Sequence, residues 1–199
     1  SAKVTVLRIE YRKPNDFEEC VLDALAGCSF MKGIGAADLV LVGHSFGGAV
    51  VIKAGELHES VRGIASMSPQ LYGTRQVENL NKPLLLIHGM SDSILSHEAS
   101  EDIYRRALEP KRIVLYAEAG HSLIQAKQQI DDLLSDWIPA RLGGVPGGSI
   151  KRSQDGRSRR SGIGTRLAMR SGLAASAGRG GSFQRNMCIA PSVIVCVAP

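Results

Sequence analysis

Cysteine is scarce in this sequence and long apolar runs are missing, and both features limit what the protein can be. The 199 residues include four cysteines, with no CxxC pair and no disulfide-dense spacing. Such usage is typical of a reducing compartment, so we expect a cytoplasmic location. No signal peptide is visible at the N-terminus. The C-terminal apolar run Val193–Val197 is far too short to cross a bilayer, and we expect no membrane span.

Histidine, cysteine and carboxylate residues do not stand at the spacings that metal sites use. None of the five histidines is paired with cysteines or carboxylates at such a spacing. We therefore expect no metal and no other cofactor. His44 and His88 are interpreted as structural residues, while His58 and His97 are interpreted as residues near helix ends.

Acidic residues are almost absent from the last part of the chain. Residues 141–199 carry ten Lys and Arg but one acid, Asp155, together with half of the 22 glycines and a single aromatic residue, Phe183. This composition buries too little apolar surface to offset the entropy of ordering, so it predicts a disordered tail after a folded domain over residues 1–140. Basic charge can contact nucleic acid or anionic lipid. Without interleaved aromatic residues a solvated tail is favoured, and we expect no specific nucleic-acid partner.

Strand-like and helix-like patterns alternate through residues 4–139. Buried-strand patterns are found at Val4–Tyr11, Leu39–Val42, Val61–Met67, Leu84–His88 and Arg112–Tyr116. Amphipathic or buried helix patterns lie between them, the first beginning near Asn15 as the expected N-cap, and a last one runs from His121 to Pro139. Alternation at these lengths predicts an α/β fold, a doubly wound and mostly parallel sheet with right-handed crossovers.

The segment Gly43-His44-Ser45-Phe46-Gly47-Gly48 is the most informative part of the sequence. It has the pattern G-x-S-x-G between a buried strand and a helix, which is typical of a nucleophile elbow. The turn is so sharp that the serine takes a strained backbone conformation and its hydroxyl stands at the tip. Glycines are suited to Gly43 and Gly47 because side chains there would collide across the turn. A turn serine without a catalytic role is the alternative.

An acid and a histidine follow the next strands in the order that a serine nucleophile needs. Asp92 comes just after Leu84–His88, and His121 comes just after Arg112–Tyr116. The order Ser, Asp, His is that of the α/β-hydrolases. Residues 4–139 thus resemble the C-terminal two-thirds of an α/β-hydrolase. They are most similar to the dienelactone-hydrolase-like and prolyl-oligopeptidase-like branches, where H-G-x-x-D and G-H-[SG] follow the last two strands.

This resemblance implies a catalytic triad of Ser45, His121 and Asp92. Ser45 Oγ would attack an acyl carbon, His121 would take and return the proton, and Asp92 would hold the imidazole tautomer. The backbone N–H of Phe46 would donate to the oxyanion. The simpler alternatives are that Asp92 caps a helix or stabilises its own turn, and that His121 is a helix N-terminal residue without a task.

The resemblance also implies that some of the usual structure lies outside this sequence. The strand Val4–Tyr11 resembles the fourth of eight family strands, so the first strands and the loop that carries the second oxyanion donor are not found. Gln70–Lys82 leaves no room for an inserted cap domain, which favours a small-molecule acyl substrate. The expected function is a serine hydrolase of small esters, thioesters or amides. The alternative is a catalytically impaired hydrolase-like protein that acts as an interaction module.

Overall fold

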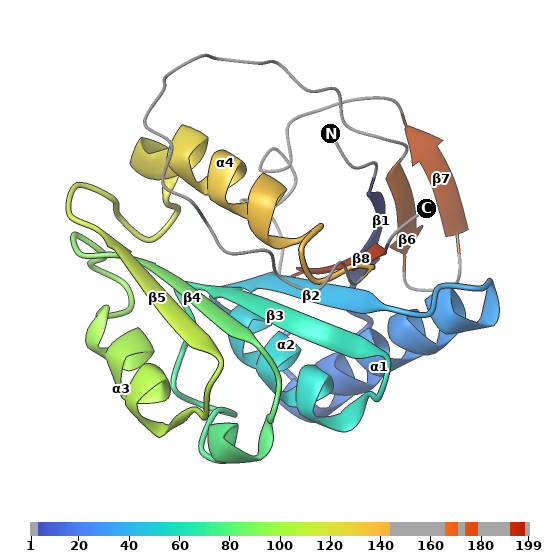
Figure 1. Cartoon of the computed structure of the whole chain (residues 1–199), viewed down its shortest axis with the longest axis horizontal. Coiled ribbons are helices and arrows are strands. Elements are labelled where there is room, and N and C mark those ends of the chain that lie inside the picture. The colour runs from blue at the N-terminus through green and yellow to red at the C-terminus, as the bar shows by residue number, and fades with distance from the viewer. Residues whose placement is uncertain (1–3, 144–165, 171–173, 179–191, 198–199) are drawn as a thin grey trace.

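The computed structural model describes residues 4–143, 166–170, 174–178 and 192–197 of the chain (Figure 1). Eight strands form one sheet in the order β5-β4-β3-β2-β8-β1-β6-β7. The strands are β1 Thr5–Glu10, β2 Leu39–His44, β3 Val61–Met67, β4 Leu84–Gly89, β5 Lys111–Tyr116, β6 Arg166–Arg170, β7 Ala174–Gly178 and β8 Ser192–Val197.

The sheet is mixed but mostly parallel. Strands β2, β3, β4 and β5 pair in parallel, and β1 has the same direction because both β1 and β2 are antiparallel to β8. Strand β6 is parallel to β1, and β7 is antiparallel to β6. The predicted α/β fold with a mostly parallel, doubly wound sheet is therefore confirmed.

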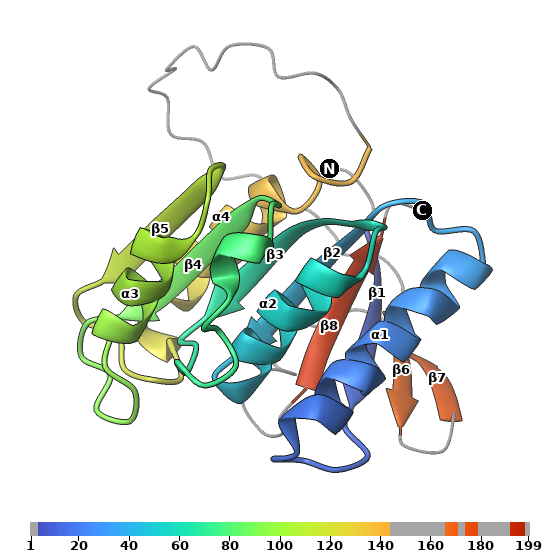
Figure 2. The same ribbon diagram turned by 90° about the horizontal axis from the view of Figure 1, so that it is seen from below.

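Helices cover both faces of the sheet. They are α1 Phe17–Gly33, α2 Phe46–Leu57, α3 Glu98–Arg106 and α4 Lys127–Trp137, with short 3₁₀ turns at Val77–Asn79 and Ile124–Ala126. Figures 1 and 2 show α1, α2 and α3 on one face and α4 on the other. This three-layer arrangement is the consequence of right-handed crossovers between parallel strands.

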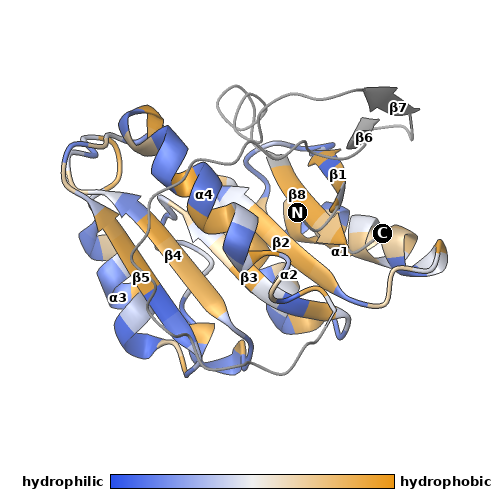
Figure 3. Ribbon diagram, turned by 45° about the horizontal axis from the view of Figure 1, so that its top comes forward, coloured by the Kyte–Doolittle hydropathy of each residue, from blue (hydrophilic) through white to orange (hydrophobic). Residues whose placement is uncertain are grey.

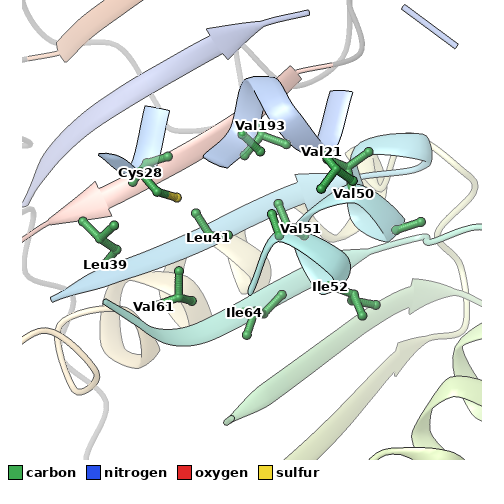
Figure 4. Close-up of a cluster of buried hydrophobic side chains, with 14 of the residues drawn as sticks. Val21, Cys28, Leu39, Leu41, Val50, Val51, Ile52, Val61, Ile64 and Val193 are labelled. Carbon is green, nitrogen blue, oxygen red and sulfur yellow. The ribbon is translucent and has the colours of Figure 1, made fainter. Parts of the chain in front are cut away.

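Each face of the sheet has its own hydrophobic core, because the central strands are apolar on both sides. Leu39 and Leu41 of β2 pack in the cluster with α1 and α2, whereas Val40 and Val42 pack in the cluster with α4. Figure 4 shows the first of these clusters and Figure 3 shows the apolar central strands beside polar outer helix surfaces. A strand buried on both faces reads as a continuous apolar run, which is why the sequence revealed it.

The N-cap of helix α1 lies one residue later than the sequence predicts. Asn15 takes a left-handed conformation with φ 76°, and Asp16 is the N-cap. The Asp16 carboxylate accepts a hydrogen bond from the backbone N–H of Glu19 at 3.2 Å. Asp and Asn are about equally favourable at the N-cap position, so the sequence alone does not indicate which of the adjacent residues Asn15 and Asp16 caps the helix.

Strand β8 is the main correction to the sequence-based expectations. The composition of residues 141–199 predicts a disordered tail, but residues 166–170 and 174–178 form strands, and residues 192–197 form a strand inside the sheet. Val195 pairs with Leu7 of β1 on one side and with Leu41 of β2 on the other. The remaining tail residues, 144–165, 171–173, 179–191 and 198–199, lie outside the described part.

The burial of β8 explains why this segment differs from the rest of the tail. Val193, Val195 and Val197 point into the core with α1 and α2, while Ile194 and Cys196 point into the core with α4. β-branched side chains favour strands, and β1 and β2 otherwise present facing edges with unpaired N–H and C=O groups. A composition averaged over the whole tail concealed these six residues.

The compact part of the chain also continues slightly past residue 140. Leu142 is buried against α4, and the Arg141 guanidinium lies 5.1 Å from the centre of the Trp137 ring. Among the described residues, no helix is both long enough and apolar enough to cross a membrane.

Candidate active site

The carboxyl ends of β2, β4 and β5 meet at one edge of the sheet, and each is followed by a residue that the sequence singled out. Ser45 follows β2, Asp92 follows β4 by a short turn, and His121 lies in the loop after β5. In open α/β sheets, sites form at this edge because the loops after parallel strands converge there. The structure brings the three side chains together.

Ser45 stands in a strained turn between β2 and α2. Its backbone has φ 56° and ψ −121°, an unfavourable region for a residue with a side chain. Its N–H donates to the carbonyl of Met67 at 2.8 Å, and its carbonyl accepts from the N–H of Gly48 at 2.9 Å. A Cβ on Gly43 would lie 2.1 Å from the carbonyl oxygen of Gly47, so only glycine permits this close approach.

His121 connects the serine to the carboxylate. Its Nε2 lies 3.0 Å from Ser45 Oγ, and its Nδ1 lies 2.7 Å from Asp92 Oδ2. A carboxylate can only accept, so Nδ1 carries the hydrogen and Nε2 is left to accept from the Ser45 hydroxyl. This is the tautomer that a general base needs.

The side chain of Asp92 is fully buried, and donors surround its carboxylate. Oδ1 accepts from the backbone N–H groups of Ile94 and Leu95, both at 2.8 Å. Oδ2 faces His121 and also His88 Nε2 at 3.1 Å. Burial by itself raises the pKa of Asp92, but the hydrogen bonds from Leu95, His121 and Ile94 outweigh it, so its pKa lies below the ordinary value.

His44 and Ser68 hold the loop that carries His121. His44 Nε2 lies 2.7 Å from the carbonyl oxygen of His121, and the Ser68 hydroxyl donates to the same oxygen at 3.4 Å. The rings of His44 and His121 lie 4.9 Å apart. Burial lowers the pKa of His44, which keeps its ring neutral. His44 therefore has a specific structural role, because its ring anchors the loop that carries His121, the candidate general base.

His88 makes contacts that the sequence analysis missed. It was interpreted only as a structural residue, yet its ring contacts Asp92 directly. The signal was the H-G-x-x-D spacing, in which the histidine ends a strand and the aspartate follows four residues later. That spacing was noted for its resemblance alone, and it does not reveal which way either side chain turns.

The backbone N–H of Phe46 is the expected oxyanion donor. Phe46 is the first residue of α2, and the first N–H groups of a helix have no partner within it. These groups carry a partial positive charge, which favours an anion close to the Ser45 side. Among the described residues we assign no second oxyanion donor. The strand beside β2 is β8, which is antiparallel to it, so the residues that follow β8 lie at the opposite edge of the sheet from Ser45.

A cleft of about 650 Å³ opens beside Phe46. It is lined by Asn15, Asp16, Phe17, Glu18, Phe46, Gln70 and Tyr72. The aromatic rings meet edge to face, with Phe17 6.1 Å from Phe46 and 5.4 Å from Tyr72. The cleft lies between the loop after β1 and the loop after β3, on the same sheet edge as Ser45.

In the described part of the chain, no three His, Cys, Asp or Glu side chains are grouped to hold a metal ion.

The chain is similar to hydrolases by several comparisons. Residues 72–128 match the family described as "Hydrolase_4: Serine aminopeptidase, S33". A curated relative, "Uncharacterized protein YfhR" of Escherichia coli K12, is 35% identical over 65 residues. That match covers 29% of this chain and 23% of the relative, so the chain spans about a quarter of that protein.

Solved structures show the same fold. The esterase domain from a Rhodothermus marinus protein matches with a TM-score of 0.51 at 18% identity, over 70% of this chain and 98% of that one. Est1E from Butyrivibrio proteoclasticus matches with 0.56 at 17% identity, over 63% and 70%. A serine hydrolase homologue from Coxiella burnetii matches with 0.56 at 19% identity, over 62% and 61%. The chain therefore has the α/β-hydrolase fold.

Proposed function

We propose that the protein is a serine hydrolase that cleaves small esters, thioesters or amides through an acyl-enzyme. The observation that carries this proposal is the continuous hydrogen-bonded chain from Ser45 Oγ through His121 to Asp92, with contacts of 3.0 and 2.7 Å. The three residues come from loops after three different strands. A turn serine or a helix-capping aspartate has no need of such a chain.

The reaction follows from the positions of the hydrogens. Ser45 Oγ attacks the acyl carbon while its proton moves to His121 Nε2, and the carbonyl oxygen becomes an oxyanion near the Phe46 N–H. Collapse of this intermediate breaks the bond to the leaving group, which takes the proton from His121. Water then attacks the acyl-enzyme with the same histidine as base. The product acid leaves, and Ser45 regains its proton.

Asp92 is proposed to support both steps without accepting a proton. Its carboxylate keeps the hydrogen of His121 on Nδ1 and stabilises the imidazolium that forms when Nε2 is protonated. Burial raises the pKa of Asp92, but the hydrogen bonds from Leu95, His121 and Ile94 outweigh it, so the carboxylate stays ionised at neutral pH. An ionised partner is what the imidazolium requires.

The cleft beside Phe46 supports a small substrate. Its volume of about 650 Å³ falls within the range of small-molecule pockets, roughly 300–1,000 Å³. The connection between β3 and β4 contains only loops and the short 3₁₀ turn Val77–Asn79, so no inserted cap covers the site from there. Solved structures with this fold include an esterase domain, a monoacylglycerol lipase and Est1E with ferulic acid bound. An acyl substrate for this chain agrees with these structures.

A fluorophosphonate probe tests this proposal directly. Labelling requires a serine activated by its own base, so we expect one covalent adduct, located at Ser45 by mass spectrometry. Ser45→Ala should abolish the adduct. Ser29→Ala, at an exposed position on α1, is the matched control and should label like the unchanged chain. No labelling of the folded chain, or equal labelling of Ser45→Ala, would instead favour the interaction-module alternative.

A further inference from the structure

His88 lies at the end of β4 and is fully buried. Its Nδ1 atom is 2.7 Å from Ser100 Oγ of α3, a hydroxyl that is also fully buried. Its Nε2 atom lies 3.1 Å from Asp92 Oδ2 and 3.0 Å from the carbonyl oxygen of Leu95. Every polar atom of the ring therefore has a partner.

These partners determine where the hydrogen of His88 lies. Nε2 faces a carboxylate and a carbonyl, which can only accept, so Nε2 must carry the hydrogen. Burial lowers the pKa of His88 and keeps the ring neutral, so Nδ1 carries no hydrogen and accepts from the Ser100 hydroxyl. The Ser100 contact thus fixes both the tautomer and the orientation of the ring.

The contact with His88 completes the ring of donors around Asp92. Two backbone N–H groups hold Oδ1, while His88 and His121 share Oδ2. The carboxylate cannot turn about its χ2 bond without breaking several of these bonds at once. Without His88, Oδ2 would be held by His121 alone, and His121 is the group that Asp92 is supposed to orient.

We propose that His88 and Ser100 form a positioning pair that fixes Asp92 Oδ2 opposite His121 Nδ1. This inference rests on the proposed function, because it concerns the geometry of the same triad. The pair does not touch the substrate, and it acts only through Asp92. The simpler alternative is that His88 merely fills space at the end of a strand. Under that alternative, its replacement would alter stability without changing turnover.

Two amide substitutions at position 88 distinguish a positioning role of His88 from a space-filling role. In His88→Gln the amide nitrogen reaches approximately the place of Nε2 and can donate to Asp92. In His88→Asn the same amide is one methylene shorter and lies near the place of Nδ1, so it reaches Ser100 but not Asp92. Loss of positioning by about 1 Å costs on the order of 10²-fold in rate. We expect kcat on p-nitrophenyl acetate to fall about 10–100-fold in His88→Asn, with KM little changed, and to recover within roughly fivefold in His88→Gln.

Substitution of Ser100 tests the other half of the pair with a smaller change. Ser100→Ala removes one buried hydroxyl and leaves His88 Nδ1 without its donor, so we expect kcat to fall by about threefold to tenfold. Thr74→Val is the matched control, because Thr74 is buried and its hydroxyl donates to the carbonyl of Leu71, away from Asp92. It should lose comparable stability in urea unfolding and keep its kcat.

The rate of fluorophosphonate labelling distinguishes failure of this inference from failure of the proposed function. If the unchanged chain does not label, the proposed function fails first. If it labels and both His88→Asn and Ser100→Ala label and turn over at the same rate, the positioning pair is wrong. Equal losses in His88→Gln and His88→Asn would also overturn it, because the donor to Asp92 would then have no effect.

Discussion

His121 Nδ1 lies 2.7 Å from Asp92 Oδ2, although the two residues follow different strands and stand 29 positions apart in the chain. The contact forms because β4 and β5 are parallel neighbours, with His88 paired to Leu115 and Gly89 to Tyr116. The loops after both strands therefore begin side by side at one edge of the sheet. The sheet register, rather than either loop, determines this distance.

Replacing Asp92 by asparagine should nearly abolish turnover. The amide nitrogen would donate toward Nδ1 and favour the wrong imidazole tautomer, which costs about 10⁴ in kcat in a well-studied triad. Hydrolysis of p-nitrophenyl acetate measures the effect. Asp102→Asn, which removes a carboxylate paired with Arg106 on α3, should change kcat by less than about twofold. A similar loss in both variants would contradict a specific role for Asp92.

Adding a methyl group at Gly43 should disrupt the turn that carries Ser45. The new Cβ would stand 2.1 Å from the Gly47 carbonyl oxygen, a backbone atom that moves only if the turn opens. We expect Gly43→Ala to lose fluorophosphonate labelling and to lower the free energy of unfolding. Gly33→Ala, where no atom lies within 4 Å of the added Cβ, should label normally and gain up to about 1 kcal/mol. Normal labelling of Gly43→Ala would show that the turn is not as tight as described.

Cysteine reactivity should report whether β8 stays in the sheet. Cys196 is fully buried between β1 and β2, and burial raises the pKa of its thiol to about 12. We expect Cys196 to resist iodoacetamide under native conditions as well as Cys28 does, when peptides are mapped by mass spectrometry. Val195→Asp places a charge at a fully buried position and should expose Cys196 to rapid alkylation. Rapid alkylation of Cys196 in the unchanged chain, with Cys28 protected, would show that β8 leaves the sheet.

Stability should fall as the pH drops below about 6.5. Burial lowers the pKa of His44 and His88 from an ordinary value of 6.5, so the folded state resists protonation while the unfolded state binds protons. The free energy of unfolding then decreases on acidification by at most about 1.4 kcal/mol per pH unit for each histidine. Asp92 has a lowered pKa, so its contribution is lost only below its ordinary value of 3.8, outside this window.

Urea unfolding between pH 5 and 7.5 measures this slope. His88→Gln removes one titrating group but keeps the donor, so its slope should be shallower than that of the unchanged chain. Thr74→Val offers the control, since it removes a buried hydroxyl but no titrating group, and it should leave the slope nearly unchanged. Identical slopes in the unchanged chain and His88→Gln would mean that His88 is protonated equally in both states.

Acyl chain length should limit the substrate range. The cleft beside Phe46 has a volume of about 650 Å³ and is bounded by aromatic rings, so p-nitrophenyl acetate and butyrate should be hydrolysed with higher kcat/KM than palmitate. Turnover should be slow, about 10²–10³ below that of a hydrolase with two oxyanion donors, because we assign only the Phe46 N–H. A preference for palmitate would contradict a small substrate.

The sequence by itself predicted those features that depend on neighbouring residues. Apolar runs identified β1 to β5, and the pattern G-x-S-x-G identified the turn at Ser45, because only glycine at Gly43 fits so close to Gly47. The order of Ser45, Asp92 and His121 along the strands indicated which side chains to expect at one edge. Apolar patterning and turn sterics are local properties, so a linear sequence expresses them.

The tertiary structure alone decided the features that depend on distant partners. Residues 192–197 looked like part of a disordered tail because their stability comes from the facing edges of β1 and β2, more than 140 residues earlier in the chain. The contacts of His88 with Asp92 and Ser100 likewise depend on how the turn after β4 folds against α3. Burial and hydrogen-bond partners are set by what packs alongside a segment, and composition or spacing within that segment does not contain this information.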